Sequence, residues 1–420
     1  MRNARNGVAM ENDTFDLVIG GGSFVGLALG LGLAKSAPGV FRIAIVERMP
    51  PEAARQGAFD GRAVALTAAA KAFLEALSIW DGLAADAQPV EAMDITDSAL
   101  EMPLRSVLLH FEPSEAGGPT AFILENARLR QALFAAAADC PDIALIAPDS
   151  VAGLDVGEGR AHVTLASGRK LSASLAVAAD GQNSALRDMA GIKLVRWASD
   201  QLAITGAVAH EKPHHGRAVQ HFLPSGPFAV LPMTGNRSSI VWTEREAEAR
   251  RILALDEAGM IAEIEKRAGG WLGALTLPGK LASYPLSMTL ARAYVAPRVA
   301  LAGDAAHALH WIAGQGLNHG LKDAAALTEV LVDASRLGLD IGALTVLERY
   351  ECWRRFDSAT SAATGAALNL LFSNESTPAR LIRQFGLGLV DRLPPLKAML
   401  MREAAGLTGT LPKLLRGRLA

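Results

Sequence analysis

The sequence predicts a mixed α/β protein in which helices pack against a sheet of buried strands, and three observations support this prediction. From Asp16, an apolar strand passes into a glycine-rich turn and then into an apolar helix that runs to about Ser36. Near residue 300 a similar order recurs, with an apolar strand (298–301), a short acidic turn and a glycine-rich segment before a helix. Between these regions, residues 192–284 form short alternating segments separated by Pro and Gly, which indicates a further sheet.

Length and composition limit the classes of function. With 420 residues, half of them apolar, the chain is long enough for two domains with sizeable cores. A formal charge of -2 and few aromatic residues argue against a nucleic-acid-binding surface, which needs a basic stripe with stacking rings. Cys140 and Cys352 have neither metal-binding nor redox spacing, so we expect reduced thiols in a cytoplasmic protein without a metal site.

Neither a secretory signal nor a membrane-spanning helix is expected. Residues 1–13 are polar and lack the apolar core of a signal peptide. Residues 17–34 are apolar enough for a span, but their glycines and their change from strand to helix favour a buried nucleotide-binding fold.

The first glycine-rich turn has the pattern of a Rossmann dinucleotide site. Two registers of the G-x-G-x-x-G fingerprint compete: starting at Gly20 places Val25 at the last glycine, and starting at Gly21 places Ser23 at the middle glycine. We favour Gly21, because this register keeps Gly26 where the helix packs on the strand. The Cβ of Ser23 could then push a pyrophosphate away, or its hydroxyl could donate to a phosphate oxygen.

The next strand ends in an acidic residue. Residues 41–46 are apolar, and Glu47 follows them, about 20 residues after the last glycine of the fingerprint, as expected for a carboxylate that accepts from ribose hydroxyls. A lone fingerprint is a weak signal, but strand, glycines, helix, strand and acid in this order predict dinucleotide binding.

The segment near residue 300 suits a flavin. Gly303 and Asp304 end the strand, and the short carboxylate of Asp304 can accept a hydrogen bond from a ribityl hydroxyl. Gly314 and Gly316 let the backbone approach a flat ring, and the following helix points its N-terminal amides at the electron-rich edge of that ring.

Together these segments resemble the class A flavoprotein monooxygenases, and within them the ubiquinone-biosynthesis hydroxylases. That family carries the block H-P-x-A-G-Q-G-x-N-x-G, which here spans residues 310–320, and an Asp-Gly motif, here Asp180-Gly181. The likeness extends over nearly the whole chain, through residues 59–66, 124–130, 222–227 and 392–395.

The resemblance implies a set of FAD contacts. The N-terminal glycines and Glu47 hold the adenosine side, Arg62 lies at the pyrophosphate or the isoalloxazine, and Asp180 belongs to the cofactor site. Solvated salt bridging explains Arg62 and Arg130 equally well. The full implied set is Gly21, Gly22, Gly26, Glu47, Arg48, Arg62, Asn126, Arg130, Asp180, Gly303, Asp304, Gly314, Gln315, Gly316, Leu317 and Asn318.

Two residues of the 310–320 block depart from the family. Trp311 replaces a proline beside the ring, where it narrows the substrate pocket, stacks on the flavin or simply packs in the core. We expect His319 to be neutral, because the N-terminal end of a helix disfavours an imidazolium. The substrate-pocket candidates are His221, Phe222, Pro227 and Trp311.

The family mechanism implied by the resemblance uses NADPH or NADH to reduce FAD. O2 then adds to the reduced ring as a C4a-hydroperoxide, which attacks an electron-rich aromatic carbon. Such chemistry needs no metal or Ser-His-Asp set, and we assign no catalytic base. Only one strand-glycine-helix-acid unit is present, so we expect the reductant to bind transiently.

The resemblance also suggests a domain arrangement. Residues 14–79, 122–190 and 285–370 would form a discontinuous Rossmann-like FAD-binding domain of the aromatic hydroxylase type. Residues 80–121 and 191–284 would form an interleaved β-sheet substrate domain, and residues 371–420 a helical C-terminus. Residues 380–420 contain eight basic and two acidic residues, interspersed with leucines. This pattern fits a membrane-surface or partner contact, and equally a helix packed on its own domain.

We therefore predict an FAD-dependent monooxygenase that hydroxylates a polyprenylated phenol or quinone precursor in ubiquinone biosynthesis. Peripheral contact with the inner face of the membrane and with other quinone-biosynthesis enzymes would suit such a substrate. The alternatives are a hydroxylase of a small soluble phenol and a flavin-poor scaffold of the quinone-biosynthesis complex. The sequence does not fix the oligomeric state.

Overall fold

The two glycine-rich regions of the sequence meet in one sheet. The computed structural model describes residues 13–55, 61–97, 107–112, 118–308, 316–372 and 394–420. In it, β1 (Asp13–Gly20) pairs in parallel with β2 (Ile43–Val46) and β11 (Lys170–Ala178), while β11 also pairs in parallel with β19 (Val299–Leu301). The carboxyl ends of these strands therefore lie at the same edge of the sheet, as expected for a Rossmann-like α/β fold.

Helices cover this sheet and bury its apolar side chains. The principal ones are α1 (Phe24–Ser36), α4 (Asn126–Ala138), α8 (Gly316–Arg336) and α9 (Leu344–Phe372). Leu17, Ile19 and Leu175 point into one core cluster with residues of α1, α4 and α8, and all three are fully buried. Each such side chain contributes roughly 1.5–3 kcal/mol to stability. This core fixes the strand ends that position the site.

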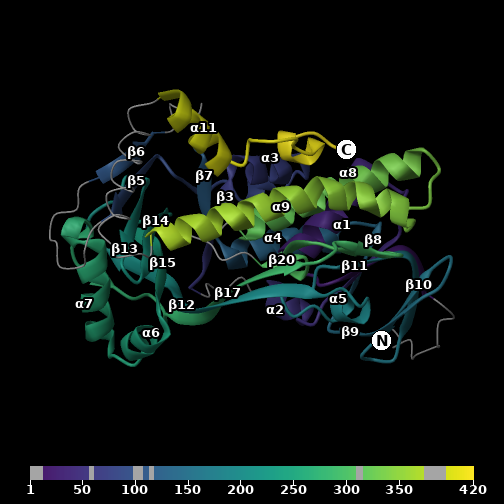
Figure 1. Cartoon of the computed structure of the whole chain (residues 1–420), viewed down its shortest axis with the longest axis horizontal. Helices are drawn as coiled ribbons and strands as arrows, with labels where there is room; N and C mark the ends of the chain where they lie inside the picture. The colour runs from purple at the N-terminus through teal and green to yellow at the C-terminus, as the bar shows by residue number, and fades with distance from the viewer. Residues whose placement is uncertain (1–12, 56–60, 98–106, 113–117, 309–315, 373–393) are drawn as a thin grey trace, which may run out of the picture.

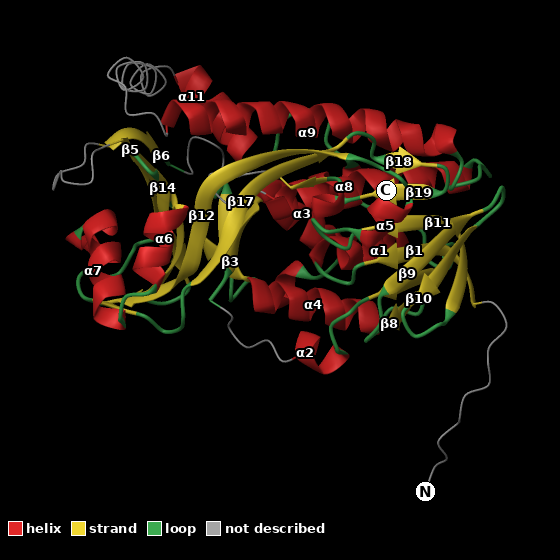
Figure 2. Cartoon of the chain, turned by 60° about the horizontal axis from the view of Figure 1, so that its bottom comes forward, coloured by secondary structure: helices red, strands yellow, loops and turns green. Residues whose placement is uncertain are grey.

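A second, largely antiparallel sheet extends away from the first. Its central strands are β12 (Leu194–His210), β13 (Arg217–Leu223), β14 (Gly226–Met233), β15 (Arg237–Arg245) and β17 (Ala282–Ala291). These strands lie almost entirely within residues 192–284, so the further sheet predicted there is confirmed. Figure 2 shows β12 and β17 as long strands that run from the second sheet into the part that carries β1 and β11.

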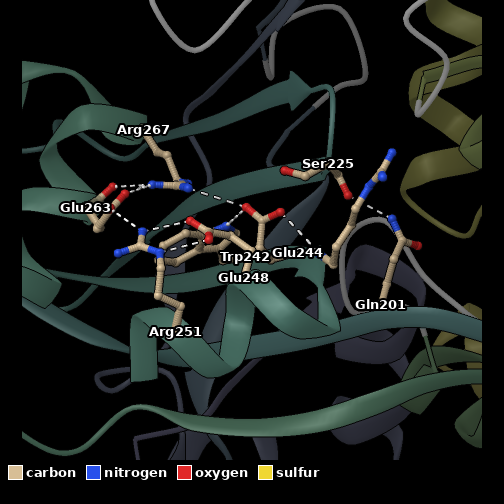
Figure 3. Close-up of polar contacts among 9 residues, drawn as sticks. Gln201, Ser225, Trp242, Glu244, Glu248, Arg251, Glu263 and Arg267 are labelled. Carbon is tan, nitrogen blue, oxygen red and sulfur yellow. Dashed lines mark hydrogen bonds and ion pairs between the residues drawn. The ribbon is translucent and has the colours of Figure 1, made fainter. Parts of the chain in front are cut away.

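Two helices cover the outer face of the second sheet, where a partly buried ionic network joins them to β15. Figure 3 shows Arg267 of α7 (Glu257–Ala268) between Glu263 and Glu244, with Arg251 of α6 (Glu246–Leu253) beside Glu248. The Arg267 guanidinium lies 4.1 Å from the ring centroid of Trp242. Both Arg267 and Glu244 are almost fully buried, so the network fixes the helices on β15.

The remaining elements complete these layers. The C-terminal segment returns to the first core, where Leu414 and Leu415 are buried.

In the described residues no helix has the length and apolar character needed to cross a bilayer. The proposed domain boundaries stay a prediction. The other elements are α2 (Pro51–Arg55), β3 (Ala63–Thr67), α3 (Ala68–Ala76), η1 (Trp80–Gly82), β4 (Gln88–Pro89), β5 (Ala92–Asp97), β6 (Val107–Phe111), β7 (Ala121–Glu125), β8 (Ile143–Ile146), β9 (Val151–Val156), β10 (Ala161–Leu165), α5 (Ala185–Met189), η3 (Gly270–Leu272), β16 (Leu275–Thr276), β18 (Val295–Ala296), η4 (Gly303–Ala305), β20 (His307–Ala308), α11 (Pro394–Ala404) and η5 (Lys413–Arg416).

The outer core of the second sheet should depend strongly on Trp242. Trp242→Ala should lower the free energy of unfolding by about 3–5 kcal/mol, because it opens a cavity and removes the ring that the Arg267 guanidinium contacts. Trp197→Ala is the matched control. Because Trp197 is 45% exposed, this substitution should lower the free energy of unfolding by less than about 0.5 kcal/mol. If urea denaturation shows the same loss of unfolding free energy in both variants, this assignment is wrong.

Candidate cofactor site

A cavity of about 660 Å³ opens at the edge where the parallel strands end. Its volume lies within the range of roughly 300–1,000 Å³ that is usual for small-molecule sites. Residues from distant parts of the sequence line it together. Those expected at a cofactor are Gly21, Glu47, Arg48, Asn126, Asp180, Asp304, Gly316 and Leu317.

The β1–α1 turn leaves no room for a Cβ at Gly21 or at Gly26. Gly21 has φ +106°, and a Cβ there would lie 2.2 Å from the carbonyl oxygen of Ala179. A Cβ on Gly26 would lie 1.9 Å from the carbonyl oxygen of Gly21. Ser23 instead has φ -93°, is exposed, and makes no side-chain capping hydrogen bond. The register that begins at Gly21 therefore fits the geometry, and the turn accommodates Ser23 without strain.

Glu47 is oriented by the backbone around it. Its Oε2 accepts from the amide of Gly22 at 2.7 Å, and its Oε1 accepts from the amide of Met49 at 2.8 Å. Each carboxylate oxygen can accept a further hydrogen bond, so the acid can still accept from ribose hydroxyls.

Two carboxamide or carboxylate oxygens in the cavity wall lack a partner in the described part of the chain. Asp180 Oδ2 accepts from the amides of Ala185 (2.9 Å) and Leu186 (3.3 Å), but Oδ1 is buried without a hydrogen bond. Asn126 Oδ1 is also buried without a hydrogen bond. Nε of Arg130, one turn further along α4, lacks a partner in the described residues too, but Arg130 does not line the cavity. Buried polar atoms are rarely left unsatisfied, so a polar ligand such as FAD fits this wall.

Asp304 carries a charge into a poorly solvated place. It follows Gly303, whose φ of +62° turns the chain toward the cavity. Although Asp304 is exposed within the cavity, desolvation raises its pKa, the charge of His307 opposes this rise, and Asp323 adds to it. A carboxylate in this environment is relieved by hydrogen-bond donors such as ribityl hydroxyls.

The start of α8 meets the cavity through Gly316 and Leu317. The Asn318 side chain lies against β3 instead, where it donates to the carbonyl of Ala65 (2.8 Å) and accepts from the amide of Thr67 (3.0 Å). Any contact of Asn318 with a cofactor is therefore left to its backbone. Three of the predicted residues, Trp311, Gly314 and Gln315, lie outside the described residues.

The neutral state expected for His319 is supported, but its main cause differs from the one expected. Desolvation lowers the pKa of His319 to about 3, and repulsion from His307 and Arg354 adds to this. The position of His319 near the start of a helix is not needed to explain it.

Other predicted residues lie outside the cavity wall. Arg62 is exposed, and its charge acts on Tyr284, which does line the cavity. His221 stacks on Phe228, whose ring belongs to the core beneath α6 and α7. The structure thus places His221 on the outer face of the second sheet. Phe222 and its cross-strand neighbour Pro227 lie on the alternate, inner face, also outside the cavity wall.

Sequence patterns gave no signal for two residues that shape the site. Tyr284 lies on β17, a strand that contains no glycine and no part of either motif. Arg187 is fully buried, and its Nη1 donates to the carbonyls of Gln182 (3.0 Å) and Ala305 (3.3 Å). It therefore ties the loop after β11 to the turn after β19, a link that only the fold reveals.

Comparison with known proteins agrees with this geometry. A family described as FAD binding domain matches residues 13–345. The ubiquinone hydroxylase UbiL of Rhodospirillum rubrum is 42% identical over 96% of this chain and 92% of its own. The 3-demethoxyubiquinol 3-hydroxylase of Escherichia coli is 33% identical over 95% of this chain and 100% of its own.

A solved structure supports the fold. The p-nitrophenol 4-monooxygenase PnpA of Pseudomonas putida superposes with a TM-score of 0.78 at 20% identity, covering 94% of this chain and 99% of its own. At this identity the similarity concerns the arrangement of the chain alone.

The raised pKa of Asp304 yields a prediction of opposite effects on stability and binding. The pKa of Asp304 in the folded protein exceeds its value of about 3.9 in the unfolded chain, so near these pH values the unfolded chain binds fewer protons than the folded protein. Asp304 therefore lowers the free energy of unfolding as the pH rises above about 3.9. Asp304→Asn should therefore make the cofactor-free protein more thermostable than wild type at pH 7, and the difference should shrink toward about pH 4. The same substitution should weaken FAD binding by about ten- to a hundredfold, by loss of a charged acceptor.

Thermal melts across this pH range and FAD titrations measure both effects. Asp200→Asn, on the surface of β12 and away from the cavity wall, is the control and should change neither quantity. A cofactor-free Asp304→Asn protein that is less stable than wild type at pH 7 would contradict the electrostatic account.

Proposed function

The chain belongs to the family of FAD-binding proteins that includes the ubiquinone hydroxylases, and from this premise we propose that it hydroxylates an aromatic ring of a polyprenylated phenol or quinone precursor in ubiquinone biosynthesis. The observation that carries the proposal is the cavity that Glu47, Asp180 and Asp304 line together. Next to it, the missing side chains of Gly21 and Gly26 let neighbouring backbone segments lie in close contact. FAD, a dinucleotide with a flat ring system and several hydroxyl groups, matches these carboxylates. When bound, FAD takes a hydride from NADPH or NADH and activates O2 for transfer to the substrate.

The chain's own residues would bind and orient the cofactor. Glu47 would accept from the adenosine ribose, and Asp304 from the ribityl chain. The amides at the start of α8 would face the ring edge, where they favour negative charge. Arg187 would hold the two loops at a fixed separation, which keeps the cofactor-binding groups on them in position.

The substrate class follows from the relatives. UbiL is named as a ubiquinone hydroxylase and the Escherichia coli relative as a hydroxylase of 3-demethoxyubiquinol. Both names describe hydroxylation of a ubiquinone-type compound. We extend that substrate class to this chain because the likeness covers nearly all of it, whereas the position hydroxylated and the tail length are left to experiment.

A substrate with a polyprenyl tail would favour peripheral contact with a membrane, and α11 offers a suitable surface. Met399 and Leu400 are exposed on it at 55% and 37%. Lys397 and the exposed Arg402 lie on the same helix, so apolar and basic side chains occur together, as in helices that bind anionic membranes.

Flavin content and substrate identity test the proposed function directly. We expect the purified protein to be yellow, with oxidised-flavin absorbance that NADPH or NADH bleaches without oxygen. A deletion strain should accumulate a quinone intermediate that lacks one hydroxyl, which mass spectrometry detects. Expression of the wild-type chain should restore the hydroxylated product. A colourless protein that restores the pathway would instead indicate a scaffold, and turnover of simple phenols alone would indicate a soluble substrate.

The membrane contact has a separate test. Leu400→Glu should reduce co-sedimentation with anionic vesicles severalfold, because it places a charge on the apolar surface of α11. Leu339→Glu is the control, since Leu339 is 49% exposed and lies in the loop between α8 and α9, which Figure 1 shows at the end of α9 away from α11. These substitutions are preferable to deleting residues 380–420, which would also remove the buried Leu414 and Leu415. Equal pelleting of both variants would rule out docking through α11.

A further inference from the structure

A buried ionic cluster lies behind the Gly303–Asp304 turn. Asp323 of α8 is completely buried, and its Oδ2 accepts from the amide of Gly303 at 2.9 Å and bonds Nε2 of His307 at 2.7 Å. Its Oδ1 accepts from Nε of Arg354 on α9 at 2.7 Å. Neither Asp323 nor Arg354 lines the cavity, so neither would contact a cofactor bound there.

Helix α8 is shaped to bring this carboxylate to the turn. A Cβ on Gly320 would lie 2.5 Å from Cγ2 of Val25 and 3.4 Å from Cα of Gly303, so the helix and the turn are in close contact there. Asp323 follows Gly320 by three residues and therefore lies on the same face of the helix. Gly320 lets α8 come close to the turn, and Asp323 accepts a hydrogen bond from the amide of Gly303 in that turn.

Helix α9 contributes two anchors from one of its faces. The hydroxyl of Tyr350 donates to the carbonyl of Leu301, the last residue of β19, at 2.7 Å. Arg354, one turn further along, binds Asp323 and also Asp357, which Lys322 of α8 contacts at 2.6 Å. The end of β19 is thus held by α9 directly at Leu301 and, through Asp323, at Gly303. Figure 1 shows α9 running alongside α8 across the molecule.

General stability does not explain why charges occupy this place. Replacing a buried ion pair by well-packed apolar groups is often neutral or stabilising, whereas a fixed set of hydrogen bonds specifies one geometry. Burial by itself would raise the pKa of Asp323, but His307 and Arg354 outweigh this and hold the pKa below its usual range. Lys322 and Asp357 extend the cluster toward solvent, and the neutral His319 packs against His307. Asp323 therefore remains an anionic acceptor for the turn at neutral pH.

We propose that the face of α9 carrying Tyr350 and Arg354 positions the Gly303–Asp304 turn for the cofactor, through the Leu301 carbonyl and the Asp323 carboxylate. Tyr350 and Arg354 are positioning residues, because they touch neither cavity nor cofactor. The inference rests on FAD binding at the site described above. It adds that the affinity and environment of the flavin are set in part by a helix that does not contact it.

Substitutions at Arg354, made in the full chain, test this proposal. Arg354→Met removes the cation, and Arg354→Lys keeps it. FAD is removed and the proteins are then titrated with FAD, with the dissociation constant and the visible circular dichroism of the bound flavin as readouts. We expect the dissociation constant to rise about tenfold for Arg354→Met, as when residues that orient a metal's ligands are lost, with partial recovery for Arg354→Lys. The dichroism should change in Arg354→Met.

A matched control separates positioning from general stability. Arg267→Met removes another almost fully buried arginine, from the network in Figure 3, and should lower thermal stability without altering the FAD dissociation constant or the dichroism. If the two variants weaken FAD binding in proportion to their loss of thermal stability, Arg354 has only a general structural role and the proposal is wrong. An Arg354→Met protein that folds and binds FAD like wild type would equally overturn it.

A milder change covers the case in which Arg354→Met does not fold. Tyr350→Phe removes only the hydroxyl that binds Leu301, and we expect a smaller rise in the FAD dissociation constant with unchanged far-ultraviolet circular dichroism. An unchanged dissociation constant in Tyr350→Phe would then count against the proposal. If the wild-type chain itself binds no FAD, the proposed function fails, and this result is distinct from any ranking of the variants.

Discussion

The close approach of three chain segments at one edge of the parallel sheet is the constraint on which the rest of the structure depends. The turn after β1 touches the turn after β11, because Gly21 has no Cβ and so fits against Ala179. The turn after β19 approaches α1, where Val25 contacts Gly303 and Gly320. These approaches leave room at the strand ends for a dinucleotide, and a side chain at Gly21 or Gly26 would force the backbone apart.

Charges around the cavity are arranged at a cost to stability. Asp180 keeps an unsatisfied buried oxygen in the described part of the chain, and the pKa of Asp304 is raised by desolvation. Such groups are typical of functional sites, where a ligand supplies the missing hydrogen bonds. Behind them, Asp323 and Arg187 hold the backbone with hydrogen bonds that are already complete. The wall thus offers polar atoms to a cofactor, while Asp323 and Arg187 are already committed to the backbone behind it.

How much the sequence could predict depends on how local each feature is. The strand-glycine-helix order around Gly21 and around Gly303 is local, so the α/β fold and part of the cavity wall could be predicted. The face on which His221 lies depends on the pairing of β13 with β14, which its own sequence does not determine. Arg187 and Tyr284 reach the site through contacts between distant segments, so no pattern near them indicated a role.

The central claim is that these distant segments bind one FAD molecule together. Hydrogen–deuterium exchange of the full chain, measured with and without FAD, tests it most directly. The account predicts slower exchange on FAD addition in peptides covering residues 20–26, 180–187, 303–308 and 316–320, with a common dependence on FAD concentration. Protection confined to the first of these segments, or found only elsewhere in the chain, would contradict it.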